Sequence, residues 1–214
     1  MKKFDLSVYL VTDRDLSLGR TTEYIIEQAV KGGATIVQLR EKNISTREFY
    51  DIALNIKKCL KPLNIPLIIN DRMDIALAVD ADGLHIGQSD IPYEVARKIL
   101  GPNKIIGLSV ENIEQARKAE ELDVDYIGIS PVFDTKSKAD ISTPLGLENM
   151  KKISNFTTHP MVGIGGINVE NAAQVIEAGA QGIAVISAIV SQKDPMKATK
   201  DLRQIVDKVK ANNK

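Results

Sequence analysis

The strongest chemical signal in the sequence is a group of charged side chains that follow short apolar runs. The run "IIN" leads directly to Asn70 and Asp71, and Asp90 follows the next run along the chain. Arg40 and Lys42 follow the run before them. Two carboxylates beside cations can form ordinary ion pairs. They can equally form a site for Mg²⁺ and a diphosphate, because Mg²⁺ takes one or two carboxylates and completes its shell with water and phosphate oxygens. The spacing alone leaves both interpretations open.

A second group of residues suits a phosphate. Gly165 and Gly166 follow a later apolar run, and Ser187 opens the short helix-like segment "SAIV". Glycine loops and helix N-termini bind phosphate through backbone N–H groups. The alternative is that the glycines only permit a tight turn. Between the two groups lies the long loop 130–146, "SPVFDTKSKADISTPLG", which brings Lys138 as a third cation and is a candidate lid.

Neither histidine is a clear catalytic base. His85 lies inside the run "GLHIG", where it could face the core or a substrate, and His159 precedes a run rather than following one. The sequence shows no Ser-His-Asp arrangement, no His-Glu-x-x-His motif and no cysteine cluster. The lone Cys59 can form no intramolecular disulfide, and its helical surroundings predict a packing role. Arg72, next to Asp71, is expected to form an ion pair.

These residues need a scaffold that gathers strand ends, and the sequence predicts one. Eight short runs rich in β-branched and aliphatic residues alternate with segments of helical periodicity. The runs span 7–12, 35–39, 66–70, 83–87, 105–109, 126–130, 161–165 and 182–187. Near-continuous apolar strands indicate a parallel sheet covered by helices. Eight such units in 214 residues predict an α/β fold, a (β/α)8 TIM barrel near its minimum size.

The barrel is expected to form a single domain over 1–214, with the barrel itself at about 7–190 and a C-terminal helix at about 195–211. An open doubly wound sheet is the alternative. It is disfavoured because no Gly-x-Gly-x-x-Gly motif follows the first run and because the repeats continue without a linker. In TIM barrels, residues that precede strands serve stability. By this rule Asp80, Asp82, Asp123 and Asp125 are expected to be turn or solubility residues rather than site residues.

The composition argues against nucleic acid and membrane as partners. The 28 basic and 28 acidic side chains cancel, so no global field would draw the chain to nucleic acid or to an anionic membrane. The apolar stretch "IAVISAIV" is shorter than the roughly 20 residues that span a bilayer. The N-terminus, "MKKFDLSVYL", meets Asp5 before any apolar segment long enough for a secretory signal, so a cytoplasmic location is expected.

A series of motifs extends along most of the chain: "YLVTD", "VQLREKN", "IINDRMDIALAVDADGLHIGQSD", "IIGLS", "YIGISPVFDTKSK", "VGIGGI" and "VISAI". In order and spacing they resemble the thiamine-phosphate synthase (thiamine-phosphate pyrophosphorylase) family, from Tyr9 to Ile189. The "QLREK" motif alone is weakly specific because a sister family shares it. Its combination with Asp71, Asp90 and the segment "TKSK" is specific.

The resemblance implies an enzyme, a transferase of thiamine biosynthesis. It would move the 4-amino-2-methyl-5-pyrimidinylmethyl group from its diphosphate to the ring nitrogen of 4-methyl-5-(2-phosphoethyl)thiazole, giving thiamine phosphate and diphosphate. The implied cofactor is Mg²⁺, and the implied partners are these two small molecules. Because the thiazole nitrogen is a neutral nucleophile, the reaction needs no general base. This agrees with the lack of a clear catalytic histidine.

Carried over motif by motif, the resemblance assigns three groups of residues. The pyrimidine diphosphate would be held by Gln38, Leu39, Arg40, Glu41, Lys42, Asn70, Ser109 and Lys138. Mg²⁺ would be held by Asp71 and Asp90. The thiazole phosphate would be held by Thr135, Lys136, Ser137, Gly166, Ile186 and Ser187. Within these groups, the candidates for a catalytic role are Arg40, Ser109 and Lys138.

The chain departs from the family's usual pattern in the loop 130–146. The family more often has glycine at Ser130 and proline at Lys136, while Ser137 keeps a hydroxyl. Thiazole tautomerases, the sister family, are one alternative, but their histidine corresponds to Pro131, which cannot transfer protons. A non-catalytic barrel that binds thiazole phosphate is the other, although no expected ligand residue is missing. The oligomeric state is left open, with a homo-oligomer as one option.

Overall fold

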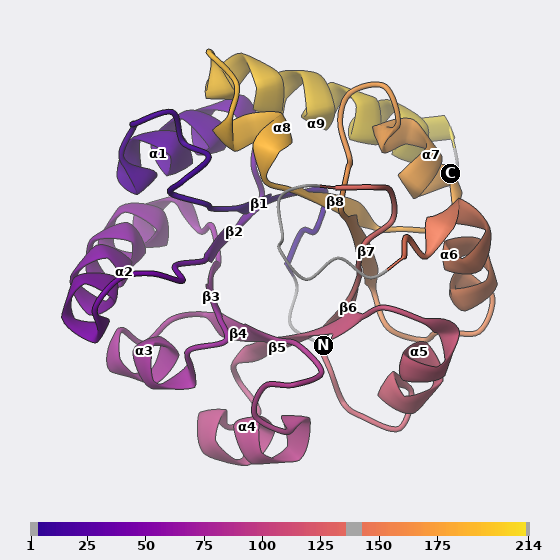
Figure 1. Ribbon diagram of the computed structural model, residues 1–214, viewed down its shortest axis with the longest axis horizontal. Coiled ribbons are helices and arrows are strands. Elements are labelled where there is room, and N and C mark those ends of the chain that lie inside the picture. Colours follow the sequence, from indigo (N-terminus) through magenta and orange to yellow (C-terminus); the bar gives the residue numbers. More distant parts are fainter. Residues whose placement is uncertain (1–3, 136–142, 213–214) are drawn as a thin grey trace.

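The computed structural model of the chain describes residues 4–135 and 143–212. Eight parallel strands close into a barrel in the order β1 to β8, and the helices surround it (Figure 1). The strands are β1 (Val8–Val11), β2 (Ile36–Leu39), β3 (Leu67–Asn70), β4 (Gly83–Ile86), β5 (Ile105–Val110), β6 (Tyr126–Ile129), β7 (Met161–Ile164) and β8 (Gly182–Val185). The helices are α1 (Thr22–Gly32), α2 (Thr46–Leu60), α3 (Met73–Ala78), α4 (Tyr93–Leu100), α5 (Ile113–Ala119), α6 (Gly146–Ser154), α7 (Ala172–Glu177), α8 (Ser187–Val190) and α9 (Pro195–Asn212), with a 3-10 turn η1 (Lys61–Leu63) after α2. Within the described ranges, no helix has the length and apolar character needed to cross a bilayer.

Closure of the sheet confirms the predicted (β/α)8 fold and excludes the open doubly wound alternative. The two terminal strands pair in parallel, with Tyr9 of β1 opposite Ala184 of β8. An open sheet would leave these strands as separate edges. The C-terminal helix predicted at about 195–211 is α9, which packs against α1, α7 and α8.

The strands are buried on both faces, as the near-continuous apolar runs predict. Every residue of β1, β2, β6 and β8 is buried, because one face of each strand lines the barrel interior and the other meets the surrounding helices. Residues that stand opposite each other on neighbouring parallel strands point to the same face of the sheet. Val11 of β1 and Ile68 of β3 therefore point into the barrel interior together with Gln38 of β2. The barrel interior is therefore mostly apolar but contains polar side chains at chosen positions.

The aspartates that precede strands anchor the end of the barrel where the strands begin. Asp82 pairs with Lys57 at 2.6 Å and accepts the backbone N–H of Leu67 at 2.8 Å. Asp125 pairs with Arg97 at 2.6 Å, and its Oδ2 also accepts the N–H of Ile106 at 2.8 Å. These contacts tie neighbouring strands together. Both residues therefore stabilise the barrel, whereas the sequence led us to expect only turn or solubility residues.

His159 lies at the same end of the barrel, as its place before β7 predicts. It lines a cavity of about 880 Å³ together with Phe4, Pro102 and Asp123. Its ring Nε2 lies 2.9 Å from the backbone carbonyl of Ala119. The contact links the end of α5 to the segment before β7, so His159 belongs to the structural end of the barrel.

Cys59 corrects one expectation from the sequence, because its side chain is exposed rather than packed. The buried stripe of α2 consists of Phe49, Ala53, Ile56 and Leu60. Cys59 is only three residues from Ile56, but at about 100° per residue it lies roughly 90° around the helix from the middle of this stripe. Helical surroundings alone therefore could not decide on which face of α2 it lies.

Candidate active site

One group of predicted site residues lies where strands β2 to β5 end, on one side of the barrel mouth. The residues are Arg40 and Lys42 after β2, Asn70 and Asp71 at the end of β3, Asp90 after β4, and Ser109 within β5. We call the end of the barrel at which the strands finish the carboxyl rim. Because these strands are neighbours in the barrel, the carboxyl rim gathers side chains that are distant in sequence.

Asp71 and Asp90 form a pair of carboxylates within hydrogen-bonding reach of each other. Asp71 has a left-handed backbone conformation, with φ of 58°, which aspartate tolerates better than most residues. Its N–H donates to the carbonyl of His85 at 2.9 Å and so fixes the end of β3 against β4. Oδ2 of Asp90 accepts the N–H of Gly87 at 2.6 Å. The loops that follow β3 and β4 therefore hold the two carboxylates close to each other.

The two carboxylates differ in how readily they ionise. Burial raises the pKa of Asp71, but Lys42, whose Nζ lies 2.6 Å from Oδ2, outweighs burial and brings this pKa below its ordinary value. Burial and the charge of Asp71 hold the pKa of Asp90 above its ordinary value, although the Gly87 N–H opposes them. A cation between the carboxylates would remove the repulsion that raises the pKa of Asp90.

The carboxylate pair fits Mg²⁺ when an anionic ligand is also bound. Across residues 4–135 and 143–212, no three His, Cys, Asp or Glu side chains gather as they do around a metal enclosed by protein. Mg²⁺ is commonly held by one or two carboxylates, with water and phosphate oxygens completing the shell. Asp71 and Asp90 supply such a pair, and the adjacent Lys42 adds a positive charge for the phosphate.

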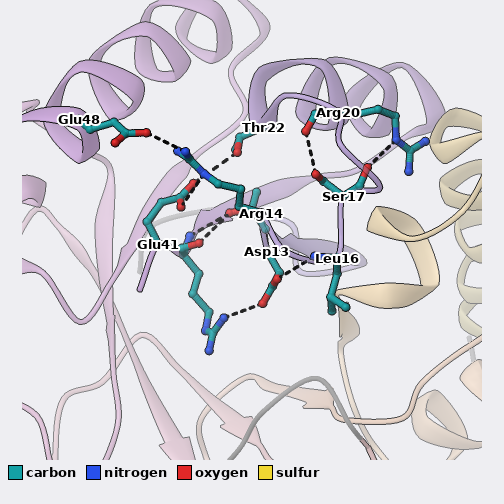
Figure 2. A network of polar contacts seen from close by, with 10 residues as sticks. Asp13, Arg14, Leu16, Ser17, Arg20, Thr22, Glu41 and Glu48 are labelled. Carbon is teal, nitrogen blue, oxygen red and sulfur yellow. Dashed lines mark hydrogen bonds and ion pairs between the residues drawn. The ribbon is translucent and has the colours of Figure 1, made fainter. Parts of the chain in front are cut away.

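Arg40 is held in place by the loop that follows β1. Its Nη1 donates to Oδ2 of Asp13 at 2.8 Å, and its backbone N–H donates to the Thr12 hydroxyl at 2.9 Å. The Asp13 Oδ1 in turn accepts the N–H of Leu16 at 3.2 Å. Figure 2 shows this loop, with the Asp13 carboxylate directed toward the backbone N–H of Leu16. The ion pair is largely buried, with side-chain exposures of 16% for Arg40 and 13% for Asp13, so the guanidinium has a fixed direction.

The Glu41 carboxylate forms an ion pair with Arg14 of the same loop and a hydrogen bond with Thr22, the first residue of α1. Its Oε2 lies 3.3 Å from Nε of Arg14, and its Oε1 accepts the Thr22 hydroxyl at 3.3 Å (Figure 2). Burial raises the pKa of Glu41 although Arg14 opposes this shift. Arg14 also reaches Glu48 at 2.7 Å and so links the loop to α2. Because Leu39 is fully buried as well, contacts of Glu41 and Leu39 with a ligand would come from their backbones.

A continuous chain of hydrogen bonds crosses the barrel interior beneath the carboxyl rim. Nε2 of Gln38 donates to the Tyr9 hydroxyl at 2.9 Å, and the hydroxyls of Tyr9 and Tyr126 lie 2.7 Å apart. Nδ1 of His85 lies 2.9 Å from the Tyr126 hydroxyl, and its Nε2 lies 2.9 Å from Oγ of Ser109. Two predicted substrate residues, Gln38 and Ser109, are thus the ends of one chain.

The second predicted group lies on the opposite side of the barrel mouth. Thr135, Gly166 and Ser187 line a cavity of about 410 Å³, and Ile186 directly precedes α8. Gly166 has φ of 65°, and a Cβ at this position would lie 2.5 Å from the carbonyl oxygen of Asp134. The glycine therefore permits a close approach of two backbone segments that a larger residue would prevent. Three predicted residues of the loop lie outside the described residues: Lys136, Ser137 and Lys138.

Three residues that contact the site residues or the hydrogen-bond chain have no role predicted from the sequence: Asp13, Tyr9 and Tyr126. Asp13 follows β1, and the strand-end rule that selects Asp71 would also have selected it. Tyr9 and Tyr126 lie inside buried strands, where their rings are typical of an apolar core. Nothing in the local sequence distinguishes their hydroxyls from those of other tyrosines. Arg72 forms the predicted ion pair, 2.6 Å from Asp74.

Comparisons with known proteins agree on one family. The family model described as thiamine monophosphate synthase matches residues 8–189. The thiamine-phosphate synthase of Clostridium novyi (strain NT) is 52% identical over 198 residues, which cover 92% of this chain and 97% of the relative. The thiamine-phosphate synthase of Clostridium acetobutylicum is 51% identical over 214 residues, covering 100% of this chain and 99% of the relative.

Solved structures give the same relationship. A thiamine phosphate pyrophosphorylase from Pyrococcus furiosus superposes with a TM-score of 0.87 at 43% identity, covering 95% of this chain and 96% of that one. A 3-hexulose-6-phosphate synthase superposes with a TM-score of 0.70 at 19% identity, covering 94% of this chain and 99% of that one. The second similarity concerns the barrel fold alone.

Proposed function

The chain belongs to the thiamine monophosphate synthase family, and on this premise we propose how its carboxyl rim brings about the reaction. Its activity is that of a thiamine-phosphate synthase, a transferase. The proposed substrates are 4-amino-2-methyl-5-pyrimidinylmethyl diphosphate and 4-methyl-5-(2-phosphoethyl)thiazole. The proposed products are thiamine phosphate and diphosphate.

The observation that carries the proposal is the cluster of Asp71, Asp90 and Lys42. The two interacting carboxylates, one with a raised pKa, repel each other until a cation is bound. Mg²⁺ held by Asp71 and Asp90 would neutralise charge on the diphosphate and make it a better leaving group. Lys42 would cover phosphate charge that the metal leaves exposed. This arrangement supports a reaction in which diphosphate departs.

The remaining residues of the first group would position the pyrimidine substrate. Gln38, Asn70 and Ser109 present neutral polar groups suited to the aminopyrimidine ring. Arg40, oriented by Asp13, would bind the diphosphate. Lys138 is proposed to contact the same diphosphate. Substrate held in this way would expose its exocyclic carbon to the opposite side of the barrel mouth.

The second group would hold the thiazole phosphate. Backbone N–H groups at Gly166, Ile186 and Ser187, together with the Thr135 hydroxyl, are suited to phosphate oxygens. The cavity of about 410 Å³ that Thr135, Gly166 and Ser187 line is consistent with a small phosphorylated ring. Ser137 and Lys136 are proposed to complete the site.

The chemical step needs no proton transfer. The thiazole nitrogen forms a bond to the exocyclic carbon of the pyrimidine, while the bond from this carbon to the diphosphate oxygen breaks and its electron pair leaves with diphosphate. The attacking nitrogen is neutral and becomes the quaternary nitrogen of the product, so no base is required. Both ring nitrogens of His85 face neighbouring side chains, Tyr126 and Ser109, which is consistent with a structural role.

A direct assay tests the proposed function. The purified protein is supplied with both substrates and Mg²⁺, and thiamine phosphate is measured over time. We expect thiamine phosphate to form, its formation to stop when EDTA is added, and its formation to resume when excess Mg²⁺ is added. Full activity with EDTA would contradict the metal site. A folded protein that forms no thiamine phosphate, but binds thiazole phosphate in calorimetry, would favour the non-catalytic alternative.

A further inference from the structure

The hydrogen-bond chain through the barrel interior does more than fill the core. We propose that it fixes the proton arrangement of the site, so that Gln38 presents an acceptor and Ser109 presents a donor to the pyrimidine substrate. Tyr9, Tyr126 and His85 would then be positioning residues that act through the two ends. The proposal rests on the proposed function for the identity of the substrate. The order of protons in the chain can be measured independently of activity.

The two tyrosines limit how protons can be arranged. Tyr9 and Tyr126 are 1% and 0% exposed, and burial raises the pKa of both hydroxyls far above the ordinary value. Both therefore stay neutral, and each hydroxyl has one proton to donate. Because their oxygens lie 2.7 Å apart, one of them donates to the other. The direction of that one bond is coupled to every other bond in the chain.

The orientation of the Gln38 amide selects the direction. Its Nε2 faces the Tyr9 hydroxyl, and an amide nitrogen can only donate. Tyr9 then donates to Tyr126, and Tyr126 donates to Nδ1 of His85. The remaining imidazole proton lies on Nε2 and is donated to the Ser109 oxygen. In this order the Ser109 hydroxyl keeps its own proton for the substrate, and the Gln38 carbonyl stays outside the chain as an acceptor.

Two inward-facing glycines show that the interior is shaped around these rings. A Cβ at Gly107 would lie 2.0 Å from Cζ of Tyr126, and a Cβ at Gly128 would lie 3.3 Å from Cε1 of His85. Gly107 pairs with both residues across the sheet, because it stands opposite His85 on β4 and Tyr126 on β6. The space for the aromatic rings thus comes from neighbouring strands, and alanine at Gly107 would displace the Tyr126 ring.

The inferred proton order suits an aminopyrimidine. The ring carries an exocyclic amino group, which donates, and ring nitrogens, which accept. Gln38 as acceptor and Ser109 as donor complement these groups. The reverse order would turn the amide nitrogen of Gln38 toward the substrate and make Ser109 an acceptor. The amino group would then meet a second donor, which weakens binding because a buried donor is left unpaired.

Nitrogen-15 NMR of histidine-labelled protein tests the proton order directly. The spectrum separates the neutral form with its proton on Nε2 from the form with its proton on Nδ1. The signals of the other histidine are assigned with His159→Gln. We expect a proton on Nε2 of His85, which faces Ser109, and none on Nδ1, which faces the Tyr126 hydroxyl. A proton on Nδ1, or on both nitrogens, in the unliganded wild-type protein would overturn the proposal.

Kinetics of Tyr126→Phe test the consequence for the substrate. The variant keeps the ring and removes the hydroxyl in the middle of the chain. We expect the KM for the pyrimidine diphosphate to rise roughly 3- to 10-fold, with the KM for thiazole phosphate unchanged, as is typical for the loss of one hydrogen-bond contribution. The matched control is Tyr93→Phe. Tyr93 is also buried and donates to the carbonyl of Asp123, but it lies on α4 and takes no part in the hydrogen-bond chain.

The outcomes separate the proposal from its alternatives. If Tyr126→Phe and Tyr93→Phe lose similar stability and neither changes a KM, the hydrogen-bond chain has only a structural role and the proposal is wrong. If Tyr126→Phe does not fold, the NMR result on the wild-type protein decides. If the wild-type protein makes no thiamine phosphate, the proposed function fails, while the NMR spectrum still decides whether the proton order is as inferred.

Discussion

At the scale of single residues, the direction of Arg40 depends on Asp13. The two side chains form a largely buried ion pair at 2.8 Å, and Asp13 is itself fixed by the N–H of Leu16. A guanidinium that lacks this partner would sample several rotamers, and binding of diphosphate would have to order it. We therefore propose that Asp13 acts on the substrate through Arg40.

Asp13→Ala tests this dependence. We expect kcat/KM for the pyrimidine diphosphate to fall roughly 10-fold or more, because hydrogen bonds to charged groups contribute about 1.5–3 kcal/mol. The KM for thiazole phosphate should not change. Asp15→Ala is the control, since Asp15 is an exposed carboxylate in the same loop. Equal kinetics for the two variants would contradict the role assigned to Asp13.

The sequence allowed some of these residues to be predicted and not others. Asp71 could be singled out because it directly follows an apolar run, and Asp90 because it lies three residues after the next run, where residues at strand ends are often catalytic. The partnership of Tyr9 and Tyr126 could not be predicted, since the two hydroxyls are 117 residues apart in sequence. Their contact depends on the register of strands around the barrel, which local patterns do not contain.

At the scale of elements, hydrogen bonds between the residue that follows α5 and the segment before β7 hold two loops together. Both loops lie at the end of the barrel where the strands begin. Glu120 follows α5 and accepts the Thr157 hydroxyl at 2.5 Å, and its other oxygen accepts the N–H and the hydroxyl of Thr158, each at 2.9 Å. Burial raises the pKa of Glu120, but these hydrogen bonds outweigh it and bring the pKa below its ordinary value of 4.5. The ionised carboxylate thus stabilises the fold.

Glu120→Gln should lower the free energy of unfolding by about 1 kcal/mol at pH 7. Because the folded pKa is lowered, the stabilisation is fully present above the ordinary pKa and is lost as the pH falls through the folded value. The difference between wild type and variant should therefore shrink below about pH 4.5. Urea unfolding at several pH values measures it. Glu121→Gln is the exposed control, and a difference that does not vary with pH would argue against this account.

The elements themselves were predictable to different degrees. The strands could be located because both of their faces are buried, which leaves continuous apolar runs such as "LIIN" in β3. The helix faces were harder to predict, as Cys59 shows. Its neighbours on α2 include both buried and exposed residues, and only the packing of α2 against the barrel decides which side is covered.

At the scale of the whole molecule, we propose that the barrel separates stability from chemistry. Two ion pairs of the same kind and distance illustrate the division. Lys42 and Asp71 lie 2.6 Å apart at the carboxyl rim, and Lys57 and Asp82 lie 2.6 Å apart at the opposite end. The Asp82 carboxylate also accepts the backbone N–H of Leu67 and so holds β3. The Asp71 carboxylate instead faces that of Asp90.

The overall architecture was the most predictable property of the chain. Eight strand-helix units could be counted in the sequence, and a parallel sheet of eight such units closes with few alternatives. The proposed site rests on the same count, because catalytic residues of such barrels lie where the strands end. The hydrogen bonds through the barrel interior that link Gln38 to Ser109 could be found only from the structure.

The most direct measurement compares Asp71→Asn with Asp82→Asn, two substitutions that each remove the charge of one lysine-paired aspartate. For each variant, kcat/KM with both substrates and saturating Mg²⁺ is measured beside the free energy of unfolding. We expect Asp71→Asn to lower kcat/KM roughly 100-fold or more with little loss of stability. Asp82→Asn should lower stability by about 1–3 kcal/mol and leave kcat/KM of the folded protein nearly unchanged. Undiminished kcat/KM in Asp71→Asn, or an equal loss in both variants, would contradict a reaction centred on the carboxyl rim.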